Sequence, residues 1–144
     1  MITLRGITWD HPRGLAPMQA TAAAWEREHG VRVEWTARSL HAIGAQPIEE
    51  LAAHYDLLVV DHPFAGVAAR TGLVLALDQH LPPAFLKEQA AQSVGLSHPS
   101  YHYEGHQWAL AIDAAAQVSS YRPELLERLG AAVPRTWDLS LIHI

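Results

Sequence analysis

The chain has 144 residues, 49% of them hydrophobic, which is enough for one domain with a buried core and too few for two complete ones. Its 15 acidic residues outnumber its 10 basic residues, and no basic cluster interrupts the net charge of −5, so nucleic acid is not expected as a partner. The absence of cysteine excludes disulfides, thiolate metal sites and cysteine nucleophiles.

Predicted strands and helices alternate in the first part of the chain. Residues 2–9 are rich in β-branched and aromatic residues and predict a strand, followed by a loop of turn formers over 10–14. Apolar residues at helical spacing predict a helix over 15–29, which Gly30 ends. Residues 31–36 alternate between apolar and polar side chains, as is typical of an edge strand.

The next elements complete a β-α-β-α-β order. Pro47 and two glutamates behind it predict the start of a short helix. The continuous apolar run 57–60 predicts a central parallel strand that is covered on both faces. Such alternation favours an α/β fold with a parallel, doubly wound sheet.

The rest of the chain predicts shorter elements. A hairpin is expected over 100–111, turning at Glu104-Gly105 and continuing into an apolar strand over 108–112. Further predicted elements are a helix near 64–71, an extended segment over 74–77, a helix within 83–92, a strand over 117–121, a helix over 123–129 stopped by Gly130, and a helix capped by Thr136.

Asp-His-Pro occurs twice directly after a predicted strand, as Asp10-His11-Pro12 and as Asp61-His62-Pro63. Ligands of open parallel sheets bind outside the carboxyl ends of the strands, so both triplets are expected at one edge, where Asp and His can bind a polar ligand. Two alternatives stay open. The triplets are ordinary loop residues, or His11, His62 and the two carboxylates hold a divalent metal ion.

Trp9 ends the first predicted strand at the same edge. A flat aromatic face beside hydrogen-bonding side chains suits a sugar ring, while the alternative is a tryptophan of the core. The ten histidines invite a test for hydrolytic catalysis, but the sequence has no G-x-S-x-G, P-loop or G-x-G-x-x-G motif after a strand. The sequence therefore predicts no enzyme and no cofactor.

The most specific segment is 101–138, YHYEGHQWALAIDAAAQVSSYRPELLERLGAAVPRTWD. It resembles the hinge and second-lobe entry of the family 1 extracellular solute-binding proteins of ABC importers, the maltose-binding type. The matching residues are Gly105, Trp108, Ala109, Leu110, Ile112, Asp113, Tyr121, Leu125, Leu126, Gly130, Val133, Pro134, Thr136, Trp137 and Asp138. The upstream part agrees more loosely, and Ala111 stands where many members have proline.

The resemblance implies a periplasmic-binding-protein-like (type II) N-terminal lobe with a doubly wound sheet over 1–113, left incomplete. A hinge and the start of a second lobe follow over 114–138, where small residues can absorb a rotation while Asp113 faces the cleft. Thr136 predicts the start of a helix, but residues 139–144 do not continue it, and we interpret them as a non-native tail.

The function implied by the resemblance is the capture of a small polar solute, a carbohydrate, for delivery to ABC permease subunits, by a protein that is monomeric at full length. The periplasm or the cell surface is implied as the location, although the start MITLRGITWD has no features of a signal peptide. A metal-dependent enzyme and a cytoplasmic sensor domain are the alternatives. Because one wall of the site is missing, this chain is expected to expose apolar surface and to bind solute negligibly.

Overall fold

The computed structural model describes residues 2–39, 41, 42, 46–115, 118–136 and 138. The chain divides into two compact units, Met1–Ala114 and Ala115–Ile144. Each unit is described by itself below.

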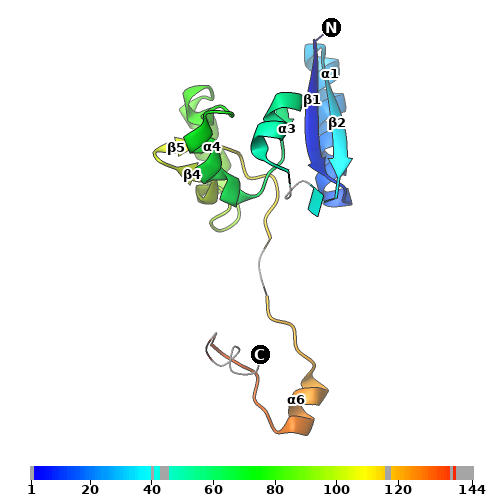
Figure 1. The fold of residues 1–144 in the computed structure, drawn as a ribbon, viewed down its shortest axis with the longest axis vertical. Helices are drawn as coiled ribbons and strands as arrows, with labels where there is room; N and C mark the ends of the chain where they lie inside the picture. Colours follow the sequence, from blue (N-terminus) through cyan, green and yellow to red (C-terminus); the bar gives the residue numbers. More distant parts are fainter. Residues whose placement is uncertain (1, 40, 43–45, 116–117, 137, 139–144) are drawn as a thin grey trace. The chain divides into compact units, whose positions relative to one another are not determined.

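The first unit begins with the predicted alternation of strands and helices. The elements are β1 (Ile2–Trp9), α1 (Pro12–His29), β2 (Val31–Arg38), α3 (Ile48–His54) and β3 (Leu57–Leu58). All pairings in this sheet are parallel, in the order β2-β1-β3, which confirms the predicted parallel sheet. Figure 1 shows α1 running along the β1–β2 pair. The fold is mixed α/β.

β1 is the central strand of the described sheet. It pairs along its whole length with β2, from Ile2 opposite Val31 to Trp9 opposite Arg38, so the prediction of an edge position for β2 is confirmed. The predicted central position of residues 57–60 is wrong. Within the described residues no segment pairs with the outer side of β3, and its strand geometry covers two residues only.

The start of α1 differs from the sequence prediction. Residues 10–14 were expected to form a loop, but the helix begins at Pro12, in the first-turn position that proline tolerates. His11 caps the helix with extended backbone, and its Nδ1 accepts from the Arg13 N–H at 3.1 Å. The predicted end is confirmed, because Gly30 adopts the left-handed conformation, φ 67°, that closes a helix.

A small core lies between α3 and the sheet. Ile7 and Leu51 are 0% and 1% exposed, and three half-buried side chains pack against them: Trp9, Tyr55 and Leu58. The Asp56 carboxylate accepts from the Arg5 N–H at 2.7 Å, while the Asp56 N–H donates to the Arg5 carbonyl at 2.7 Å. These two bonds attach the start of β3 to β1.

Short elements make up the remainder of the first unit. They are η1 (His62–Phe64), α4 (Ala65–Thr71), η2 (Leu77–Gln79), α5 (Pro83–Gln92), η3 (Pro99–Tyr101), β4 (His102–Tyr103) and β5 (His106–Gln107). The hairpin is confirmed, and it turns through Glu104 and Gly105 with φ 49° and 84°. The apolar strand expected over 108–112 does not form, because β5 ends at Gln107.

The second unit contains α6 (Pro123–Leu129), which Gly130 ends with φ 61°, as the sequence predicts. Residues 118–121 join no strand, and Gln117 lies outside the described residues. The helix expected after Thr136 and the tail 139–144 also fall outside them, apart from Asp138. No helix in the described ranges combines the length and the apolar composition needed to cross a membrane.

Candidate functional site

The carboxyl ends of β1 and β3 meet at one edge of the sheet, because the two strands are parallel neighbours. The topology therefore brings both Asp-His-Pro triplets to the same edge, as expected for residues that follow parallel strands. The described structure then decides what each side chain does there.

Trp9 is half-buried and packs against the Ile7–Leu51 core. Its indole ring also lies directly on Gly14 of α1, where an added Cβ would come within 2.5 Å of the ring. The main role of Trp9 is therefore packing against Gly14 and the core. The part of its ring that faces the solvent is what remains for a ligand.

The first triplet is engaged with α1. The Asp10 N–H donates to the Arg38 carbonyl at 2.7 Å and extends the β1–β2 pairing by one residue, while its carboxylate is exposed. The His11 imidazole uses Nδ1 as the helix cap. In the part of the chain that the structure describes, no three His, Asp or Glu side chains lie together as a metal site needs.

The second triplet lies where the chain passes from β3 into η1. Asp61 and His62 are exposed, and Asp61 makes no side-chain bond to the start of η1. No hydrogen bond or ion pair joins the Asp61 carboxylate to another described residue. This carboxylate is therefore available to a ligand.

Asp113 is paired with a residue from α1. Its Oδ2 lies 3.2 Å from Arg13 NH2, with side chains that are 33% and 61% exposed. The ion pair connects residues a hundred positions apart and brings Asp113 to the amino-terminal end of α1, beside the carboxyl end of β1. Sequence reasoning identified Asp113 but missed Arg13, which no local pattern distinguishes from the other scattered arginines.

Tyr101 is a further residue that sequence reasoning placed only in the hairpin. Its hydroxyl donates to the Val60 carbonyl at 3.2 Å, and its own carbonyl accepts from the Trp108 N–H at 3.0 Å. Burial raises the pKa of the Tyr101 phenol above its usual value, and the negative charges of Asp61 and Asp113 raise it further. Both carboxylates therefore act electrostatically on the Tyr101 phenol.

A cavity of about 520 Å³ opens next to this group. Its walls are mostly apolar, with Val60 and Tyr101 among them. The other walls come from Met18 of α1, Trp35 of β2, α3, the residues around β3, Phe64 with α4, and the segments 73–77 and 108–112 of the first unit. Carboxylates and a phenol beside a mostly apolar cavity are features of small-molecule sites.

Comparison with known proteins supports the fold. No family model matches the chain, and no curated protein matches it. The crystal structure of an ABC transporter solute-binding protein from Agrobacterium radiobacter K84, in complex with ribitol, is similar with a TM-score of 0.60 and 20% sequence identity. The similarity covers 95% of this chain and 35% of that protein. The chain thus has an α/β fold with a parallel sheet, similar to the corresponding third of a solute-binding protein.

Proposed function

We propose that the chain supplies the first lobe, over residues 1–113, and the hinge and entry into the second lobe, over 114–138, of the solute-binding subunit of an ABC importer. One observation carries the proposal. The Tyr101 hydroxyl donates to the carbonyl of Val60, the residue before Asp61, and the charges of Asp61 and of Asp113, in the segment leading out of the first unit, both act on this phenol. In a fold similar to that of a solute-binding protein, this is a place for a solute.

The proposed solute is small and polar, and it belongs to the carbohydrates and polyols. The candidate ligand-binding residues are Trp9, Asp10, His11, Asp61, His62 and Asp113. Carboxylate oxygens accept hydrogen bonds from hydroxyl groups, and the exposed part of the Trp9 ring can contact the C–H face of a sugar. The structural neighbour binds ribitol, which is a polyol.

The solute is bound without chemical change, and the loaded protein delivers it to permease subunits from the periplasm or the cell surface. The proposed full-length protein is a monomer. His11 gives the rival metal-dependent enzyme little support, because its imidazole already caps α1.

The proposal is tested by nuclear magnetic resonance of the 144-residue chain titrated with ribitol. A complete site that binds at about 1 μM would keep roughly millimolar affinity with half its contacts. We expect saturable amide shifts at millimolar ribitol in residues 9–11, 60–62 and 113, and weaker shifts in Asp61→Asn.

The matched control is Glu28→Gln, which converts an exposed carboxylate to an amide at the carboxyl-terminal end of α1. The candidate site lies at the amino-terminal end of this helix. This variant should respond to ribitol as the original chain does. Shifts that are absent at saturating ribitol, or that spread over other surfaces, would refute the proposed site.

A further inference from the structure

Tyr101 connects two parts of the candidate site that are far apart in the sequence. Its hydroxyl is bound to the carbonyl of Val60, the residue before Asp61. Its carbonyl is bound to the N–H of Trp108, which begins the segment that leads to Asp113. A shift of Tyr101 would therefore move the two carboxylates relative to each other.

Of the two carboxylates that act on Tyr101, one is paired with a cation and, in the described chain, the other is not. Asp113 shares its charge with Arg13 at 3.2 Å. Among the described residues, the Asp61 carboxylate has no such partner.

The hydrogen-bonding capacity left to a ligand is that of an acceptor. The phenol proton of Tyr101 is used on Val60, so the phenol oxygen offers a lone pair, and the Asp61 carboxylate offers acceptors only. A bound group must therefore bring donors, and a negatively charged group would be repelled by the Asp61 carboxylate.

We infer that Tyr101 is a positioning residue of the solute site, which holds Asp61 and Asp113 at one place, and that the site so formed accepts neutral, hydroxyl-rich solutes and rejects anionic ones. The selectivity rests on the proposed function. The position of Tyr101 does not.

The position is tested without a ligand, by following the ¹³Cζ signal of Tyr101 between about pH 3 and pH 6, where carboxyl groups ionise. We expect the signal to change over this range. Asp61→Asn and Asp113→Asn should each remove part of the change, and Glu28→Gln should remove none. The same titration curve in all four proteins would overturn the assigned position.

The selectivity is tested with ribitol and ribonate, which differ by one carboxylate in place of a terminal CH₂OH group. At low ionic strength ribonate should bind about tenfold more weakly or worse. Asp61→Asn should reduce the difference in affinity between ribitol and ribonate. Tyr101→Phe should weaken ribitol binding, while the amide chemical shifts of β1 stay unchanged.

Equal affinity for ribitol and ribonate would overturn the selectivity and leave the proposed function standing. Binding of neither compound would overturn the proposed function together with the selectivity, while the ¹³Cζ titration still decides the position of Tyr101.

Discussion

Close packing of an aromatic ring on a glycine fixes the geometry at the carboxyl end of β1. Gly14 is buried in the first turn of α1, and the ring of Trp9 occupies the space that a Cβ would need, with ring atoms 2.5–2.8 Å from its position. The same device recurs at Gly6, where an added Cβ would lie 2.5 Å from the Trp35 ring. At both places the tryptophan ring fits because glycine has no side chain there.

Gly14→Ala should therefore reduce the free energy of unfolding by about 1–3 kcal/mol, because the atoms displaced are the middle of the Trp9 ring rather than a mobile end. The matched control is Gly66→Ala in α4, whose Cβ would meet its nearest neighbours at 3.7–3.8 Å. Gly66→Ala should be neutral or stabilise by about 0.5–1 kcal/mol, as is usual for alanine in a helix. Urea unfolding of the two variants measures the difference, and similar stabilities would contradict the packing argument.

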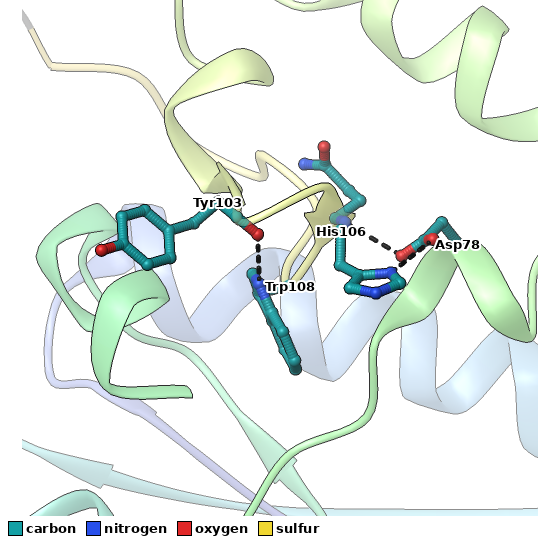
Figure 2. Close-up of polar contacts among 5 residues, drawn as sticks. Asp78, Tyr103, His106 and Trp108 are labelled. Carbon is teal, nitrogen blue, oxygen red and sulfur yellow. Dashed lines mark hydrogen bonds and ion pairs between the residues drawn. The ribbon is translucent and has the colours of Figure 1, made fainter. Parts of the chain in front are cut away.

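The carboxylate of Asp78 attaches the hairpin to η2 (Figure 2). Asp78 of η2 accepts from His106 Nδ1 and from the Gln107 N–H, both at 2.9 Å. Behind it, the buried Gln107 amide donates to the carbonyls of His98 and Ala109 at 3.0 and 2.8 Å. Figure 2 also shows the Trp108 indole N–H donating to the Tyr103 carbonyl, at 2.9 Å. These bonds align the segment that continues to Asp113.

The attachment should depend on pH. The hydrogen bond from His106, followed by that from the Gln107 N–H, lowers the pKa of Asp78 below its usual 3.8. A carboxyl group with a lowered folded pKa stabilises the protein above about pH 4, and this contribution is lost as the pH falls through the folded value. Asp78→Asn should thus lower the melting temperature near pH 6 and make little difference near pH 2.

Calorimetric melting of Asp78→Asn against pH checks this, with Glu28→Gln as the control that should follow the original chain throughout. A destabilisation by Asp78→Asn that persists undiminished at the acid end would show that the Asp78 charge is not its cause.

The molecule as a whole carries one side of the proposed site. The described sheet ends at β3, and both residues of β3 line the apolar cavity. The chain matches about a third of the length of its structural neighbour, 35%. Under the proposed function the solute needs a second wall, so the contacts described here are only part of a complete set.

We therefore expect no micromolar binding of ribitol by the 144-residue chain in calorimetry. The heat should be close to that of dilution at micromolar concentrations, since half of the contacts would leave only millimolar affinity. A clear micromolar isotherm would mean that the first unit binds solute alone, and the proposed requirement for a second wall would be wrong.

Local patterns were sufficient for most of the helices and for the order of elements. The spacing of apolar residues with a terminal glycine predicted α1 up to Gly30 and α6 up to Gly130, and the alternation in 31–36 predicted an edge strand. The pair Glu104-Gly105 predicted the hairpin turn. Each of these signals is carried by a few neighbouring residues, so these features follow from local sequence alone.

Features that depend on distant residues became visible only in the folded chain. The apolar run 57–60 resembles a central strand, but centrality depends on a neighbour on each side, and the described chain provides one. Of the candidate site, the sequence proposed six residues, with Asp61 and Asp113 among them, and their role stays a prediction. It did not show that Tyr101 is bound to Val60 or that Arg13 pairs with Asp113, because contacts across 41 and 100 positions leave no periodic pattern in the residues that make them.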